Sequence, residues 1–296
     1  MSRILANSLL LLAAALWGAA FVAQSEAGAY LSAGWFTGLR FILAFLTVLP
    51  LGIAEARRAP GGWWQGLPEL LPLAVVFAAS TLLQQWALGF TSVTHAGFLT
   101  GLYVIFVPLL EMIFLRRAPH GLLWLAAVLA LAGTWLLSGG LDHFSRGDGM
   151  IVLSALGFAV QILLMQRAAQ QGDRPVAAAL SQSAACVALG CVIGAAGGPL
   201  PWHAVSRCLP QLLYGGIVSG GIAFLLQALC QRYTGAAEAA VMLMAEALFA
   251  AIFAAILLHE RLRLNGWLGC ALLLAALVLA QLPALLPRRA ARLQRV

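Results

Sequence analysis

The sequence predicts an all-α integral membrane protein with ten transmembrane helices, arranged as two inverted five-helix repeats. Three observations lead to this expectation. Of the 296 residues, 62% are hydrophobic and only 9% are charged. The apolar residues gather in ten runs, each long enough for a helix of ~20 residues to cross a bilayer. The second half of the chain also repeats the pattern of the first half at an offset of 143 positions.

The composition excludes several other classes of protein. A soluble domain carries about 25% charged residues, far more than this chain offers to cover a surface. A membrane β-barrel needs short alternating strands, whereas Leu, Ala and Val form unbroken runs here. The chain has no lysine, which excludes a Walker A loop and a Schiff-base lysine. Its net charge of +7 indicates arginines retained on the cytoplasmic side of a membrane, not a nucleic-acid partner.

Proline supports the placement of the spans. Pro68, Pro119, Pro175 and Pro210 each fall near an expected first turn, where a missing backbone N–H costs little. Pro108 lies inside the fourth span and should kink it. The first apolar run exceeds the 7–15 residues typical of a signal peptide, so we expect it to be retained as a span. The expected spans are 7–24, 33–53, 68–89, 93–115, 120–139, 149–167, 175–196, 209–231, 236–258 and 264–283.

Arginine counting gives the expected orientation. With the N-terminus inside, twelve arginines fall at cytoplasmic ends and four on the outer side, which favours cytoplasmic termini in a plasma (bacterial inner) membrane. The last residues, 284–296, form a basic tail that should lie on anionic lipid headgroups. Its arginines recur at roughly helical spacing and are Arg288, Arg289, Arg292 and Arg295.

The internal repeat is the strongest functional signal. At the offset of 143 positions, 82–84 (Leu-Leu-Gln) matches 225–227, and 124–125 (Trp-Leu) matches 267–268. The expected units, 1–140 and 149–283, each contain five spans, and an odd number reverses the second unit in the membrane. Inverted repeats are typical of alternating-access carriers with a binding site near the midplane. The alternative is that duplication only built a stable bundle.

Several motifs resemble those of the drug/metabolite transporter superfamily, EamA type. They are 15–18 (Ala-Leu-Trp-Gly) with Phe21-Val22, Arg40-Phe41, 84–88 (Gln-Gln-Trp-Ala-Leu), 96–104 with 108–110, and 239–246 with 257–260. The resemblance implies a ten-span transporter, commonly an exporter of amino acids or other small metabolites. It also implies that spans 1, 3, 4, 6, 8 and 9 surround a central cavity, with spans 5 and 10 at the periphery.

The chain departs from this pattern at two places. The second copy of the motif usually reads Glu-Pro where this chain has Glu246-Ala247, so the kink expected in span 9 lacks its proline. The glycine usual before the closing glutamate is His259 here. The two repeats are therefore expected to gate unequally.

Glu246 is the principal candidate site residue. It falls at about the centre of span 9, where a charge costs at least ~2.5–3.5 kcal/mol, so it should face a cavity or a partner. It could contact a substrate amine or couple transport to protons. The alternative is a structural glutamate that is neutral or paired with arginine.

Other polar and aromatic side chains in the spans are expected to line the same cavity. Amides in apolar spans can bind a substrate or only join helices, and aromatic rings can hold an apolar or cationic ligand or pack. The expected cavity residues, besides Glu246, are Trp17, Phe21, Gln84, Tyr103, Gln161 and Gln227.

Arg40 and His95 are further candidates for coupling or gating. Arg40 could attract a substrate carboxylate or serve as a structural partner. His95 opens span 4, where it aligns with Glu238 at the start of span 9, and it is either a gate or proton relay or an interfacial histidine. The histidines are too far apart in sequence to predict a metal site, and no cofactor is expected.

The predicted function is a secondary transporter that exports a small metabolite, such as an amino acid, with protons as a possible coupling ion. A multidrug carrier for lipophilic cations is the alternative. A passive channel lacks support because no ring of charges or filter-like glycine run is visible. A membrane-embedded enzyme lacks a nucleophile motif, so no enzyme activity is expected.

Overall fold

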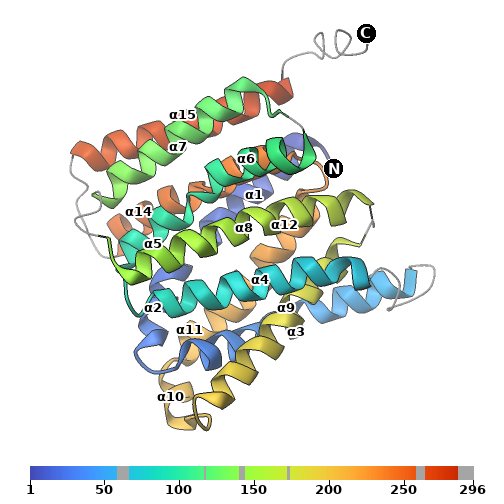
Figure 1. The fold of residues 1–296 in the computed structure, drawn as a ribbon, viewed down its shortest axis with the longest axis vertical. Coiled ribbons are helices and arrows are strands. Elements are labelled where there is room, and N and C mark those ends of the chain that lie inside the picture. Colours follow the sequence, from blue (N-terminus) through green and yellow to red (C-terminus); the bar gives the residue numbers. More distant parts are fainter. Residues whose placement is uncertain (59–66, 117, 140–143, 172–173, 258–263, 286–296) are drawn as a thin grey trace.

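The computed structural model describes residues 1–58, 67–116, 118–139, 144–171, 174–257 and 264–285. Its helices lie side by side across the molecule, with α7 and α15 together along one edge (Figure 1). Ten helical stretches of the described residues are long and apolar enough to cross a membrane. The all-α fold with ten transmembrane helices is therefore confirmed. The four tail arginines, His259 and Glu260 lie outside the described residues.

The helices follow the expected spans, with four spans divided into shorter segments. Spans 1, 4, 8 and 9 are divided in this way, and span 8 includes a π-helical segment, η2. The elements are α1 (Arg3–Gly18), α2 (Ala20–Gly28), α3 (Ala33–Arg58), α4 (Leu67–Ala87), α5 (Val93–Thr100), α6 (Tyr103–Leu115), α7 (Gly121–Ser138), α8 (Arg146–Gln171), α9 (Pro175–Ala196), α10 (Trp202–Arg207), α11 (Leu209–Leu213), η2 (Tyr214–Ala223), α12 (Phe224–Cys230), α13 (Ala236–Leu243), α14 (Ala245–Leu257) and α15 (Leu264–Leu285).

The helices that open the two halves begin in the same way. The Ser2 side chain accepts a hydrogen bond from the Leu5 N–H (3.2 Å), and the Ser145 side chain accepts one from the Asp148 N–H (3.1 Å). Each serine thereby satisfies a backbone donor that the first turn leaves free. The two pairs are related by the same offset of 143 positions, so the repeat extends to the helix caps.

Glycine allows two pairs of helices to approach closely. On α3 and α9, a Cβ atom added at Gly190 would lie 2.5 Å from the backbone nitrogen of Gly38. On α7 and α15, a Cβ atom at Gly269 would lie 2.6 Å from the carbonyl oxygen of Gly133. Close approach of the backbones increases van der Waals contact between the helices. Membrane helices depend on such contact because, in lipid, the hydrophobic effect does not drive them together. Spans 5 and 10 thus pack on each other at the edge of the bundle.

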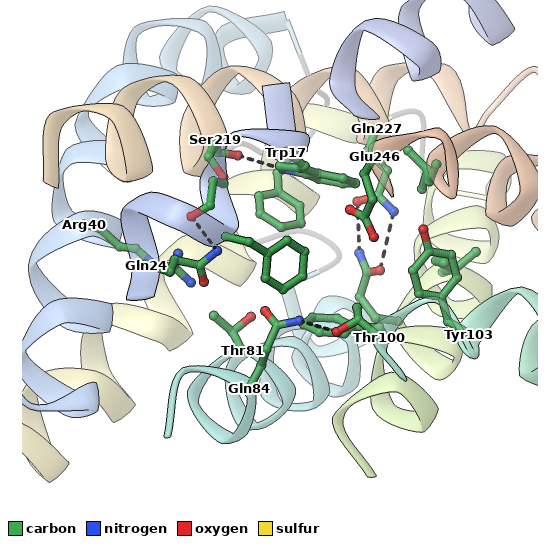
Figure 2. A pocket seen from close by; sticks show the side chains of 17 residues that line it. Trp17, Gln24, Arg40, Thr81, Gln84, Thr100, Tyr103, Ser219, Gln227 and Glu246 are labelled. Carbon is green, nitrogen blue, oxygen red and sulfur yellow. Dashed lines mark hydrogen bonds between the residues drawn. The ribbon is translucent and has the colours of Figure 1, made fainter. Parts of the chain in front are cut away.

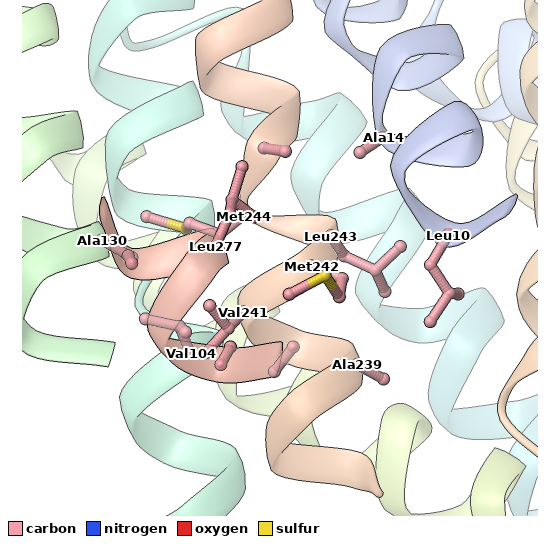
Figure 3. Close-up of a cluster of buried hydrophobic side chains, with 14 of the residues drawn as sticks. Leu10, Ala14, Val104, Ala130, Ala239, Val241, Met242, Leu243, Met244 and Leu277 are labelled. Carbon is pink, nitrogen blue, oxygen red and sulfur yellow. The ribbon is translucent and has the colours of Figure 1, made fainter. Parts of the chain in front are cut away.

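The apolar core surrounds α13. Every residue of this helix is buried. Its Met242 and Leu243 lie among Leu10 of α1, Val104 of α6 and residues of α7 and α15 (Figure 3). Because every residue of α13 is buried, apolar packing sets its position among the surrounding helices and so places the residues that follow it.

The glycine contacts predict opposite effects of two Gly→Ala substitutions. Gly190→Ala should lower the melting temperature in detergent, since overpacking costs about 1–3 kcal/mol. Gly97→Ala, in α5, should leave it unchanged or raise it, because a Cβ atom there meets nothing within 4 Å and alanine favours helix by about 0.5–1 kcal/mol. Thermal unfolding of both purified variants tests this. Equal melting temperatures would contradict the close α3–α9 contact.

Candidate functional site

A cavity of about 80 Å³ lies in the middle of the bundle, with room for several water molecules. Spans 1, 2, 3, 4, 6, 8 and 9 contribute side chains to it, whereas α7 and α15 contribute none of the described lining residues. Figure 2 shows these side chains converging from separate helices. They are Trp17, Ala20, Phe21, Gln24, Arg40, Thr81, Gln84, Thr100, Tyr103, Phe158, Gln161, Ile162, Ser219, Phe224, Gln227, Leu243 and Glu246.

Two interrupted spans meet at this cavity. Span 4 breaks at 101–102, between α5 and α6, and span 9 breaks at Met244, between α13 and α14. A Cβ atom at Gly101 would lie 2.3 Å from Cε of Met244, so the two breaks pack against each other. Interrupted helices of this kind form the substrate and ion sites of many secondary carriers.

Proline does not determine the position of either break. Pro108 lies inside α6, several residues beyond the break in span 4. Span 9 breaks at Met244 although Ala247 stands where the related motif has proline. The two breaks occupy equivalent positions of the repeats, Gly101 and Met244, at the offset of 143. Their packing against each other therefore accounts for both breaks better than local sequence does.

Glu246 follows its break directly and lies in the first turn of α14. It is 7% exposed, and its Oε1 atom has no hydrogen-bond partner. It makes no ion pair within the described part of the chain, so the structure shows no arginine partner for it. The partial positive charge of the α14 N-terminus favours a carboxylate at this position. This carboxyl group is therefore free to bind a cation or a proton.

Tyr103 occupies the equivalent position in the first repeat, directly after the break in span 4. Its buried hydroxyl group faces the Glu246 carboxyl group, close enough for an electrostatic interaction and a side-chain hydrogen bond between the two. A phenol and a carboxylate thus face the cavity from two related helix ends. Buried polar groups are costly unless they are fully hydrogen-bonded, and a bound ligand could add partners for both.

Arg40 lies at the opposite end of the cavity from Glu246 (Figure 2). Its side chain is 4% exposed, and its Cζ atom lies 5.0 Å from the ring centre of Phe41 and 5.3 Å from that of Phe36. No acidic side chain among the residues that the structure places lies within 4 Å of it, and its Nε atom has no hydrogen-bond partner. Thr81, which also lines the cavity, likewise has a buried hydroxyl without a partner.

Glutamines join the helices around the cavity. Gln161 donates to Gln182 (2.8 Å), and Gln161 and Gln227 donate to each other over 3.4 and 3.5 Å. Gln84 donates instead to Thr100 (3.0 Å). Gln84 and Gln227 occupy equivalent positions in the repeats, yet they bind different partners. The structure thus brings both into one cavity without pairing them.

Aromatic rings form one wall of the cavity. The Trp17 indole donates to the carbonyl oxygen of Ser219 (3.1 Å) in η2, and its ring lies 4.6 Å from that of Phe224. Phe21 and Phe158 also line the cavity. The hydrogen bond fixes the indole ring across the cavity, so the wall is preformed for an apolar group.

All seven expected cavity residues, together with Arg40, therefore line one cavity. His95 lies elsewhere, with its Nδ1 atom 3.6 Å from Oδ1 of Asp148. Sequence reasoning missed several lining residues. Four of these, Gln24, Thr81, Thr100 and Ser219, are polar residues inside apolar runs, a signal that the sequence does carry. Phe158 and Phe224 carry no such signal.

Comparison with known proteins identifies the family of this chain. The model of the EamA-like transporter family matches the chain twice, over residues 4–139 and 145–282. The chain belongs to the EamA-like transporter family, within the drug/metabolite transporter superfamily. It is therefore an integral membrane transporter. The two matches fall on the two halves of the internal repeat.

Individual relatives extend over most of the chain. An uncharacterized transporter of Archaeoglobus fulgidus is 27% identical over 95% of this chain and 87% of its own length. The uncharacterized transporter YwfM of Bacillus subtilis is 29% identical over 69% of this chain and 71% of its own. A solved crystal structure with 20% identity superposes with a TM-score of 0.79 and covers 96% of this chain and 98% of that one. This likeness shows a shared fold.

The glutamine contacts predict the stability of a variant. Gln161→Leu leaves Gln182 and Gln227 without a shared partner, so the protein should lose about 0.5–2 kcal/mol, the range for polar contacts between membrane helices. Gln170→Leu, on the exposed end of the same helix, is the matched control and should change little. The melting temperatures of both variants in detergent test this. An unchanged value for Gln161→Leu would mean that the amide cluster is not structural.

Proposed function

We propose that this transporter is a secondary carrier that exports a small zwitterion, such as an amino acid, by alternating access. One observation supports the substrate class. The central cavity holds one carboxyl group, Glu246, and one guanidinium group, Arg40, at opposite ends, and neither pairs with an opposite charge among the described residues. An α-amino acid carries the two complementary charges.

The cost of these charges supports a functional role. A lone charge at the bilayer centre is unfavourable by at least ~2.5–3.5 kcal/mol, and a structural role needs a partner that repays this cost. Glu246 would bind the substrate ammonium group, and Arg40 would bind the carboxylate. The guanidinium group offers planar paired donors suited to a carboxylate. The aromatic wall of Trp17 and Phe224 would receive the substrate side chain.

A lipophilic cation fits the cavity less well. Glu246 and the aromatic rings would favour such a substrate. Arg40, however, would repel it within the same small space, where little water screens the charges. The unpaired arginine therefore favours the zwitterion over multidrug efflux.

Glu246 also provides a place for coupling. When the substrate leaves, a proton can take the place of the ammonium group on the carboxylate. Because the proton and the substrate would compete for the Glu246 carboxylate, they would cross the membrane in opposite directions. No second ion site would be needed. We keep protons as the proposed coupling ion.

The repeat supports the alternating-access part of the proposal. We propose that the two units, 1–140 and 149–283, are the bodies that move relative to each other. Rocking of one unit against the other around the cavity would expose it to each side in turn. The arginine distribution supports the proposal that both termini lie in the cytoplasm of a plasma (bacterial inner) membrane, and we propose that the basic tail 284–296 binds anionic lipid.

Exchange in proteoliposomes tests the substrate class. Vesicles that contain the protein are loaded with a mixture of amino acids, their decarboxylated amines, lipophilic cations and nucleosides. We expect saturable and selective release of one or more amino acids, faster when a pH gradient is imposed. Release of amines or lipophilic cations in preference to amino acids would contradict the role of Arg40. Unselective, unsaturable release would indicate a channel.

Paired substitutions test the two charges separately. Glu246→Gln and Arg40→Gln should each reduce exchange by about 10–100-fold, the effect of losing a charge-assisted hydrogen bond, while the protein still elutes as a single species. The exposed variant Gln170→Leu is the control and should exchange normally. Normal exchange by Glu246→Gln at equal protein amounts would overturn its proposed role. A proton-coupling role alone predicts that this variant retains exchange but no longer responds to the pH gradient.

A further inference from the structure

Two clusters of buried polar residues lie outside the cavity. The first, here called the N-side latch, consists of Arg3, Asn7, Thr234 and Glu238. The Glu238 side chain is fully buried and forms an ion pair with Arg3. Glu238 Oε1 also accepts from the Asn7 amide (2.7 Å), and the Asn7 Oδ1 atom accepts from the Thr234 hydroxyl (2.9 Å). This latch joins the start of α13 in span 9 to the start of α1 in span 1.

The second cluster, here called the far-side latch, consists of Thr91, His95 and Asp148. Asp148 is fully buried and accepts a hydrogen bond from the Thr91 hydroxyl. Its Oδ1 atom lies 3.6 Å from Nδ1 of His95, and its Oδ2 atom accepts from the Ser145 N–H (2.7 Å). This latch joins the start of α5 in span 4 to the start of α8 in span 6.

The two latches are related by the internal repeat. At the offset of 143 positions, Thr91 corresponds to Thr234 and His95 to Glu238, while the α8 partner helix corresponds to α1. Spans alternate in direction, so spans 1 and 9 begin at one face of the membrane and spans 4 and 6 begin at the other. In Figure 1 the N-terminus and α5 accordingly lie on opposite sides. The two latches differ in which span carries the acidic residue: it is span 9 in the N-side latch and span 6 in the far-side latch.

Each latch is connected to the cavity by a short rigid helix. α5 and α13 have 8 residues each, which is about 12 Å of helix. Each begins at a latch and ends at a break, Gly101 or Met244, beside the cavity. A movement that separates a latch would therefore tilt a half-helix whose other end carries cavity residues.

From this arrangement we infer that the two latches are the two gates of the transport cycle, one on each membrane face. This inference rests on the proposed alternating-access function. The N-side latch closes the path from the face of the N-terminus, and the far-side latch closes the opposite path. Polar latches suit this role, because water that enters an opening path can hydrate Glu238 or Asp148 and replace the lost partners. Breaking one latch should therefore shift the protein toward the state that is open on that face.

The accessibility of a cavity cysteine tests this inference. The five native cysteines are replaced by alanine, and Ser219→Cys places a thiol in the cavity lining. A membrane-impermeant maleimide is added to one face at a time, without substrate. Glu238→Gln should raise the rate of labelling from the N-terminal face and lower it from the other face. Asp148→Asn should do the opposite, each by about tenfold, the effect of losing one charge-assisted bond in one state only.

Milder substitutions keep the test valid if a charge variant does not fold. Thr234→Val and Thr91→Val occupy equivalent positions and keep nearly the same shape, so they should produce smaller shifts in opposite directions. Folding is checked by elution as a single species. The inference would be overturned if the variants of both latches shifted the labelling rates in the same direction, or if neither the charge variants nor the threonine variants that fold shifted them at all. A purely structural role would lower the melting temperature without favouring labelling from one face.

The outcomes also separate the gates from the proposed cargo. Opposite labelling shifts without exchange of any amino acid would support the gates and reject the substrate class. Selective amino-acid exchange without labelling shifts would support the carrier and reject these gates.

Discussion

The contact between Gly101 and Met244 is the constraint on which the rest of the site depends. A membrane interior offers no water to backbone groups, so a break in a spanning helix must be enclosed by protein. Here two breaks enclose each other at the centre of the bundle, and the Met244 side chain fills the space that a Cβ atom at Gly101 would occupy. The breaks direct Tyr103 and Glu246 into the space between them. The cavity is therefore a consequence of how the two spans cross.

The repeats supply one scaffold with different chemistry on its two copies. Tyr103 in α6 corresponds to Glu246 in α14, and His95 in α5 corresponds to Glu238 in α13. If both equivalent positions carried an acidic residue, the two buried negative charges would repel each other, and the cavity would suit a symmetric cation. One acid, one phenol and a distant arginine suit an asymmetric ligand with two unlike charges. In the proposed function, the repeated scaffold allows the movement, and the different side chains on its two copies allow recognition of the substrate.

Rigid and movable contacts are distributed differently over the bundle. The glycine contacts of α3 with α9 and of α7 with α15 are apolar and close, and water cannot replace them. The contacts at the beginnings of α5 and α13 are polar and lie near the membrane faces, where water is available. The physical chemistry of the contacts therefore favours separation at the latches while the close-packed helix pairs move as units.

The sequence by itself determined the spans, the repeat and part of the set of polar residues that face the cavity, because Gln24, Thr81 and Thr100 were not expected there. Apolar runs of this length have no stable alternative to spanning helices, and polar groups such as Gln161 and Glu246 are too costly to face lipid. Only the tertiary structure decided which of these groups remain without partners and which pair. The breaks at Gly101 and Met244, and the pairing of Gln227 with Gln161, come from contacts between residues far apart in the chain. Local sequence cannot specify such contacts, since they depend on how complete helices pack.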